Sequence, residues 1–258
     1  MNAHCKALIW KIVDCGLTYC PLSSHVCNPL YLSQGCKSID DFHIPEPWNG
    51  DIENAPILFV SLNPGFTPGE LYPRLGYSGW TKPALSGVVF DNGKVEDFFE
   101  NRFDPAAGYV THANGSKFAI KMENGNIEPL KGRSYWGYVK SIADKILGRK
   151  SNIGKDFAIT ELVHCKSKSI KIIPKACHDD CMQKHLDDVL AVANNMQYLV
   201  VVGAETRKRV AKHFGMQQPI AKYKWYQLPI NHHMVNVVFV DHNAGGGSAQ
   251  KVPVPVSK

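Results

Sequence analysis

The stretch "PILFVSLNPG" (residues 56–65) decides the fold of this 258-residue chain. Its apolar run is short and continuous, and it stops at the turn signal Asn63-Pro64-Gly65. Such a run is typical of a strand buried on both faces, as found in parallel sheets that helices cover. The stretch therefore favours an α/β fold.

Three more runs of the same kind follow along the chain: "FAITELV" (157–163), "YLVVVG" (198–203) and "VNVVFVD" (235–241). Apolar residues at helical spacing occupy the segments between them, at 133–148, 176–196 and 204–215. The pattern predicts a three-layer α/β/α sandwich with a central, mainly parallel four-stranded sheet. In such sheets the functional site lies beyond the carboxyl ends of the strands.

The length suits one domain over residues 1–258, with a cysteine-rich segment at 1–45 and an irregular insertion at about 66–132. No apolar run approaches the ~18 residues of a membrane helix, and the first residues lack the pattern of a signal peptide. We therefore expect a cytoplasmic monomer without a membrane partner. A net charge of +6 and two lysine-rich stretches suggest a polyanionic partner, although a solvated basic face explains them equally well.

The eight cysteines form two groups, five within the first 36 residues and three between positions 165 and 181. Disulfides are rare in a reducing compartment, so two tight groups far apart in sequence indicate one metal or cluster site built from both. The alternative is that they are buried cysteines that act as small hydrophobic residues.

Taken together, the four strand ends resemble motifs of the uracil-DNA glycosylase superfamily, in particular its iron–sulfur (family 4-like) members. The stretch "ILFVSLNPGF" is similar to the first motif, with Ser61 in place of a glycine. "FAITELVHC" and "YLVVVGAETRKRV" are similar to the two middle strands. "VFVDHNAGGGS" is similar to the last motif, where His242 matches while Asn243 and Ala244 replace a proline and a serine.

The resemblance implies a structural [4Fe-4S] cluster. The 15 residues between Cys165 and Cys181 match the spacing of the second ligand pair. The first pair corresponds to Cys15 and Cys20, which are two residues further apart than in the family, so Cys27 could replace one of them. Four thiolates would equally suit a structural zinc ion.

The resemblance also implies roles in breaking an N-glycosidic bond. His242 would stabilise the anionic leaving base, and Asn63 would orient the attacking water. Gly65 would leave space beside ring position five, where strict uracil enzymes carry a tyrosine. Ser61 and Phe66 complete the expected base-binding residues, and other candidates for stacking on a flipped base are Tyr77, Trp80 and Phe90. Basic residues in "CKSKSIK" and "ETRKRVAK" could pair with phosphates.

Glu161 departs most from the family, whose uracil enzymes have an asparagine there that reads the uracil edge. A carboxylate is a natural acceptor for the exocyclic amine of cytosine, and it could share a proton with the neighbouring ring nitrogen. The alternative is a structural carboxylate paired with a lysine.

We therefore expect a monofunctional, base-flipping DNA glycosylase that removes a cytosine derivative substituted at ring position five, such as a hydroxymethylated or glycosylated cytosine of viral DNA, in antiviral defence. Two alternatives are a uracil or deaminated-base glycosylase in base-excision repair and a non-catalytic iron–sulfur protein that binds nucleic acid.

Overall fold

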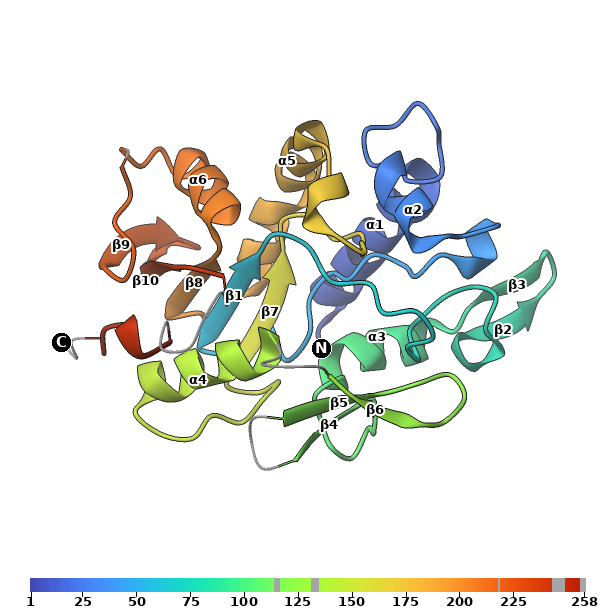
Figure 1. Ribbon diagram of the computed structural model, residues 1–258, viewed down its shortest axis with the longest axis horizontal. Helices are drawn as coiled ribbons and strands as arrows, with labels where there is room; N and C mark the ends of the chain where they lie inside the picture. The colour runs from blue at the N-terminus through green and yellow to red at the C-terminus, as the bar shows by residue number, and fades with distance from the viewer. Residues whose placement is uncertain (114–116, 131–134, 218, 243–248, 256–258) are drawn as a thin grey trace.

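A five-stranded sheet with strand order β7-β1-β8-β10-β9 forms the centre of the molecule (Figure 1). The structure is a computed structural model that describes residues 1–113, 117–130, 135–217, 219–242 and 249–255. The strands of the central sheet are β1 (Ile57–Ser61), β7 (Phe157–Glu161), β8 (Tyr198–Val202), β9 (Trp225–Ile230) and β10 (His233–Val240). The main helices are α1 (Ala3–Tyr19), α2 (Asn28–Gln34), α3 (Asn92–Asn101), α4 (Tyr135–Leu147), α5 (Lys175–Val192) and α6 (Ala204–His213).

The four predicted strands are present as β1, β7, β8 and β10, and they run parallel to one another. The prediction of a four-stranded sheet is wrong because β9 adds a fifth strand, antiparallel to β10. Two features hide β9 in the sequence. It contains Pro229, which is tolerated because the strand lies at the edge of the sheet. Its turn uses Asn231 and His232, both at positive φ, instead of the usual glycine.

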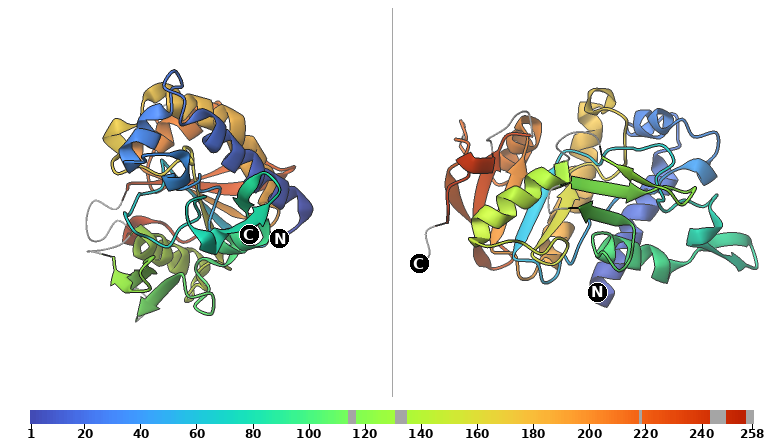
Figure 2. Two further views of the ribbon diagram at one scale, coloured as in Figure 1. Left: turned by 90° about the vertical axis from the view of Figure 1, so that its right-hand side faces the viewer. Right: turned by 60° about the horizontal axis from the view of Figure 1, so that its bottom comes forward.

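Helices cover both faces of the sheet (Figure 2). One face packs against α1, α5 and α6, with Leu58, Val60 and Leu199 in the shared core. The opposite face packs against α4, with Ile57 and Phe59 in a second core. Successive strand residues point to opposite faces, so both sets must be apolar. This explains why the strands read as unbroken apolar runs, as expected for a mixed α/β protein.

The segment at 66–132, expected to be an irregular insertion, contains regular elements. It forms α3, a hairpin of β2 (Thr81–Ala84) and β3 (Gly87–Phe90), and a second small sheet. The strands of that sheet are β4 (Val110–Ala113), β5 (Lys117–Lys121) and β6 (Ile127–Pro129). Short 3-10 turns complete the description: η1 (Ile39–Asp41), η2 (Ser78–Trp80), η3 (Ile170–Ile172) and η4 (Ala249–Lys251).

The carboxyl ends of the four parallel strands meet at one edge of the sheet, as the fold class requires. The register pairs Ser61 of β1 with Glu161 of β7, and Val202 of β8 with Val240 of β10. Residues that directly follow these strands are thereby brought together. Within the described part of the chain, no helix is long and apolar enough to cross a membrane.

Candidate active site

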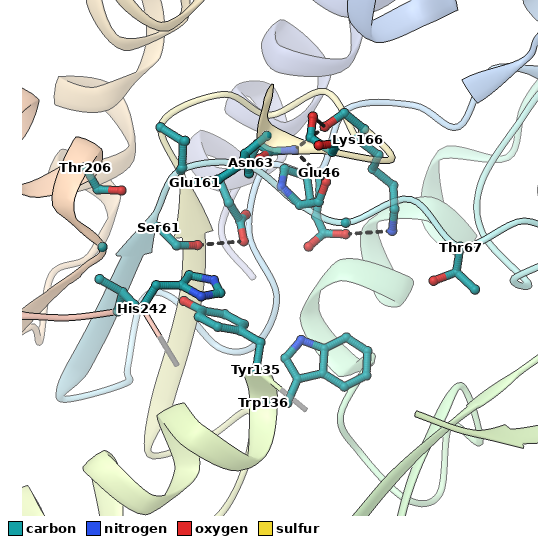
Figure 3. A pocket seen from close by; sticks show the side chains of 18 of the residues that line it. Glu46, Ser61, Asn63, Thr67, Tyr135, Trp136, Glu161, Lys166, Thr206 and His242 are labelled. Carbon is teal, nitrogen blue, oxygen red and sulfur yellow. Dashed lines mark hydrogen bonds and ion pairs between the residues drawn. The ribbon is translucent and has the colours of Figure 1, made fainter. Parts of the chain in front are cut away.

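A cavity of about 630 Å³ opens at this edge of the sheet (Figure 3). Five residues singled out from the sequence line it: Ser61, Asn63, Gly65, Glu161 and His242. They come from the ends of β1, β7 and β10, which lie far apart in sequence. The volume falls in the range of small-molecule sites, about 300–1,000 Å³.

Glu161 is the last residue of β7 and lies buried in the cavity wall. Its Oε1 accepts a hydrogen bond from Ser61 Oγ at 3.4 Å. Its Oε2 is buried and has no hydrogen-bond partner among the described residues. Burial, followed by repulsion from Glu46, raises the pKa of Glu161 well above its ordinary value of 4.5. This shift favours the protonated, neutral form of the side chain, which has one O–H donor and one acceptor oxygen.

Four buried charged side chains line the cavity beside Glu161, namely Glu46, Glu70, Arg102 and Lys166. We call them the charge quartet. Arg102 Nη1 donates to Glu46 Oε2 at 2.7 Å, and Arg102 Nη2 donates to Glu70 Oε1. Lys166 Nζ lies 3.3 Å from Glu46 Oε2 and 3.2 Å from Glu70 Oε2. Each charge thus has two partners of the opposite sign.

The charge quartet also favours the neutral form of Glu161. Its two cations and two carboxylates balance, and each is already paired within the group. An ionised Glu161 would add an uncompensated negative charge in a buried place, beside the carboxylate of Glu46. The alternative expected from the sequence, a structural salt bridge to a lysine, is not what the structure shows for Glu161. Lys166 instead pairs with Glu46 and Glu70.

Glu161→Gln should stabilise the protein increasingly as the pH rises. Below pH 4.5 the folded and unfolded states both carry the proton, so the wild type has no penalty there. Above pH 4.5 the unfolded state loses this proton while the folded state keeps it. The stability of the wild type therefore falls until the pH reaches the pKa of Glu161 in the folded state. Urea unfolding at pH 4.5 and pH 8 measures the difference, at most about 1.4 kcal/mol per pH unit. The exposed Glu128→Gln is the control, and a benefit that shrinks with pH would contradict a neutral Glu161.

Asn63 occupies the turn after β1, where its side chain is held in place. Its Nδ2 donates to Ser167 Oγ at 2.7 Å and to the carbonyl of Pro64 at 3.0 Å. Its Oδ1 is buried and, within the described ranges, accepts no hydrogen bond. An oriented acceptor of this kind can hold a water molecule against a reacting atom.

His242 follows β10 at the rim of the cavity, and its ring stacks on Tyr135 with centroids 5.7 Å apart. The hydroxyl of Tyr138 donates to the carbonyl of Asp241 at 2.7 Å, which fixes the backbone just before His242. Partial desolvation lowers the pKa of His242 below 6.5, so the imidazole is neutral at pH 7. A neutral imidazole donates one N–H, and Figure 3 shows the ring turned toward the same space as Glu161 and Tyr135.

Gly65 faces open space: a Cβ built at this position meets no atom within 4 Å. Phe66, the next residue, was expected to bind the base, but it is not among the residues that line the cavity. It packs against His43 instead, with ring centroids 4.9 Å apart. The aromatic rings that do line the cavity are those of Tyr135 and Trp136. The other stacking candidates, Tyr77, Trp80 and Phe90, pack against the hydrophobic core.

Sequence reasoning missed the charge quartet and both aromatic residues of the cavity. Lys166 was expected among the phosphate-contacting residues, yet it is only 1% exposed. The burial of Lys166 was hard to predict, because a lysine in a basic stretch is typical of a surface residue. The one available signal was the adjacency of Lys166 to a predicted buried strand end.

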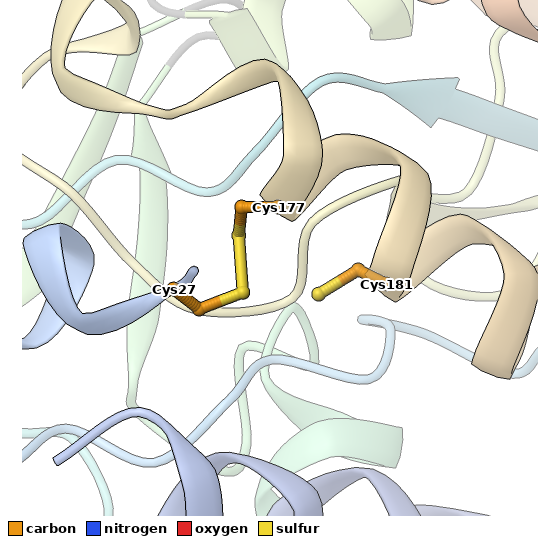
Figure 4. Close-up of side chains that lie close together, drawn as sticks. All are labelled: Cys27, Cys177 and Cys181. Carbon is orange, nitrogen blue, oxygen red and sulfur yellow. A yellow bond between two sulfur atoms is a disulfide. The ribbon is translucent and has the colours of Figure 1, made fainter. Parts of the chain in front are cut away.

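A cluster of cysteines gathers at a second place, and none of them lines the cavity. Three buried cysteines, Cys27, Cys177 and Cys181, have sulfurs within 4.8 Å of one another, close enough to bind a metal ion (Figure 4). The sulfurs of Cys27 and Cys177 are joined as a disulfide. Cys20 Sγ lies 2.9 Å from Cys165 Sγ, and both pack in the same core as the three.

The predicted ligand set differs from this group in its composition. Cys181 belongs to both, whereas Cys177, which the predicted set leaves out, is part of the metal-compatible group. Cys27, which the sequence left open as a replacement for Cys15 or Cys20, is also in the metal-compatible group. Cys15 and Cys20 line the same small crevice as Cys27, Cys165 and Cys181. Six cysteines thus gather at one place, and Cys5 and Cys36 lie outside that crevice and that group.

The donor chemistry of this place suits a metal ion held by thiolates. Contact with Cys20, followed by burial, raises the pKa of Cys165, and burial raises the pKa of Cys181. Thiols in such surroundings lose their protons when a metal cation replaces them. Because Cys27 and Cys177 are joined as a disulfide, the free thiols at this place are Cys15, Cys20, Cys165 and Cys181.

No family model and no curated protein matches the chain. The arrangement of side chains in the cavity therefore carries the functional argument.

Proposed function

We propose that the protein is a DNA glycosylase, related in fold to the uracil-DNA glycosylases, that removes a cytosine derivative substituted at ring position five. One observation carries the proposal: Asn63, Glu161 and His242 converge on a single cavity from three strand ends. These three residue types supply a water-orienting amide, a proton donor and an N–H donor for a leaving base.

The neutral Glu161 matches the edge of cytosine. Its acceptor oxygen would receive the exocyclic amine, and its O–H would donate to the adjacent ring nitrogen. Transfer of that proton as the glycosidic bond breaks would release a neutral base in place of the poor cytosine anion. Water held by Asn63 would then add to the sugar carbon and lose its proton to solvent. His242 would stabilise the charge that accumulates on the 2-oxo group.

A ring substituent would have room in this cavity. Gly65 leaves open space, and the cavity is large for a single pyrimidine ring. Removal of ordinary cytosine would destroy the host genome, so a modified cytosine of viral DNA is the target that makes physiological sense. The setting would then be defence against viruses.

A uracil or deaminated-base glycosylase is the second candidate, and the same neutral carboxyl favours it. The acceptor oxygen can receive the ring imide N–H of uracil while the O–H donates to the 4-oxo group. The two candidates separate on oligonucleotides that carry uracil, 5-methylcytosine, 5-hydroxymethylcytosine or its glucoside. Abasic sites formed only at uracil would refute the modified-cytosine proposal. Glu161→Asn, which cannot donate a proton to the ring nitrogen, should shift preference toward uracil, and simple inactivation would weaken the base-reading role.

Gly65→Tyr should narrow the substrate range without unfolding the protein. The added ring enters open space, and Gly65 is not in the left-handed region of backbone conformation. We expect release of substituted cytosines to fall by about 100-fold, because a close steric contact misplaces the reacting atoms. Release of unsubstituted pyrimidines should change little. Gly65→Ala is the matched control, and equal losses on all bases would contradict a role at ring position five.

We further propose that the cysteine cluster holds a structural [4Fe-4S] cluster, with a zinc ion as the alternative. The ligands would come from the six clustered cysteines, which tie α1 and the start of α2 to α5 and to the loop after β7. Such a site would hold the amino-terminal segment against the sheet. None of these cysteines lines the proposed base pocket.

Cys181→Ala should remove most of the iron and acid-labile sulfide, because Cys181 belongs to both possible ligand sets. Elemental analysis and visible absorbance of the purified protein measure this. Cys5→Ala, outside the cluster, should leave both unchanged. Cys15→Ala and Cys177→Ala distinguish the two possible ligand sets, because Cys15 belongs to one set and Cys177 to the other. A colourless protein that contains only zinc would refute the iron–sulfur assignment.

A further inference from the structure

An exposed apolar turn stands at the rim of the cavity. Ile170 begins the 3-10 turn η3 and is 62% exposed, yet it is also one of the residues that line the cavity. Ile172, at the other end of the turn, is exposed as well. Among the described residues, neither isoleucine belongs to the hydrophobic core clusters. Because Ile170 lines the cavity, it can contact a ligand that enters.

Hydrogen bonds attach this turn to the candidate catalytic loop. Asn63 Nδ2 donates to Ser167 Oγ at 2.7 Å, and Ser167 Oγ donates to the carbonyl of Ser169 at 3.2 Å. Ser169 then caps the turn by accepting from the backbone N–H of Lys171 at 3.2 Å. Backbone hydrogen bonds also join Ser167 to Pro64 and Phe66. Ile170 is therefore held at a fixed position relative to Asn63.

The charges around the turn suit a polyanion. Lys168, Lys171 and Lys175 are all exposed and surround the two isoleucines in sequence. Basic residues on both sides of a protruding apolar side chain match a DNA duplex, whose phosphates flank its stacked bases. A protein partner would have no need of this arrangement beside a cavity.

We propose that Ile170 is the wedge that enters the base stack when the target nucleotide turns into the cavity. It would fill the space left by the extruded base while the neighbouring lysines hold the phosphates. Apolar side chains inserted between base steps are a known means of unstacking DNA. The inference rests on the proposed glycosylase function and gives it a duplex substrate. It also names an extruding residue on the loop after β7.

The test compares duplex and single-stranded DNA. One oligonucleotide for each base of the panel above is used alone and annealed opposite guanine, with Ile170→Ala and with Val88→Ala as control. Val88 is 60% exposed but lies on the distant hairpin of β2 and β3. Ile170→Ala should slow release from the duplex about 10-fold or more and from the single strand less than about 2-fold, because only the duplex must be unstacked.

Two further readouts separate a wedge from a general binding contact. Fluorescence of 2-aminopurine placed next to the target should rise with the wild type and much less with Ile170→Ala. Mispairing the target, which makes it easier to extrude, should restore much of the lost rate. Equal losses on both DNA forms, no loss, or a wild type that acts on single strands alone would overturn the wedge while leaving the glycosylase intact. A wild type that releases no base from either form would overturn both.

Discussion

Arg102→Met should destabilise the protein by about 3–5 kcal/mol, the largest effect expected of any single substitution in the cavity wall. Methionine keeps the length and apolar stem of the side chain but removes its charge. Glu46 and Glu70 would then share one cation, Lys166, at the same depth. The guanidinium also lies over the rings of Phe98 and Trp136, at 5.2 and 5.1 Å from their centroids, and these contacts would be lost too.

The cause of that loss can be tested by restoring charge balance. In the double variant Arg102→Met with Glu70→Gln, one carboxylate and one cation remain, Glu46 and Lys166. If uncompensated charge is the main cost, this double variant should be more stable than Arg102→Met alone. Urea unfolding measures both, and Lys11→Met is the control because it breaks an exposed ion pair worth less than about 1 kcal/mol. A double variant less stable than Arg102→Met would contradict the charge-balance explanation.

The same balance bears on catalysis. Arg102 and Lys166 each lower the pKa of Glu161, while Glu46 raises it. Arg102→Met should therefore hold Glu161 in the neutral form to a higher pH. In the proposed reaction, stability and proton donation would thus depend on one buried group of side chains.

The strands and helices could be read from the sequence because burial on both faces leaves a local pattern. Residues 57–60 and 157–159 are apolar at successive positions, which is typical of strands buried on both faces. Edge strand β9 could not be read in this way, since it is half exposed, contains Pro229 and turns through Asn231 and His232. Its place in the sheet depends on pairing with β10, which forms only in the folded structure.

The residues of the candidate site likewise differ in whether the sequence predicts them. Ser61, Asn63, Glu161 and His242 could be anticipated because strand ends of a parallel sheet meet by rule. Glu70, Arg102 and Trp136 could not, since they lie in or beside the segment at 66–132, whose path depends on packing. The protonation state of Glu161 could not be predicted from the sequence either. It depends on Glu46, which is 115 residues away in sequence and close only after folding.

His242→Ala should slow base release by about 100- to 1,000-fold, equivalent to roughly 3–4 kcal/mol of transition-state stabilisation. The residue follows β10 at the rim of the cavity, where its ring is exposed and stacks on Tyr135. Its loss should therefore leave folding and DNA binding nearly unchanged. A rate defect without a binding defect is the mark of a group that acts mainly in the transition state.

The pH dependence sharpens this prediction. Because the pKa of His242 is lowered, the imidazole is already neutral at pH 7 and stays so at higher pH. If the neutral ring is the donor, the rate should not fall between pH 7 and 8 through loss of the His242 proton. His242→Gln, which keeps an N–H donor, should recover part of the rate that His242→Ala loses. Single-turnover release of the base measures all three proteins, with His4→Ala as the control on a remote surface. If His242→Ala and His4→Ala proved equally active, His242 would have no role in stabilising the leaving base.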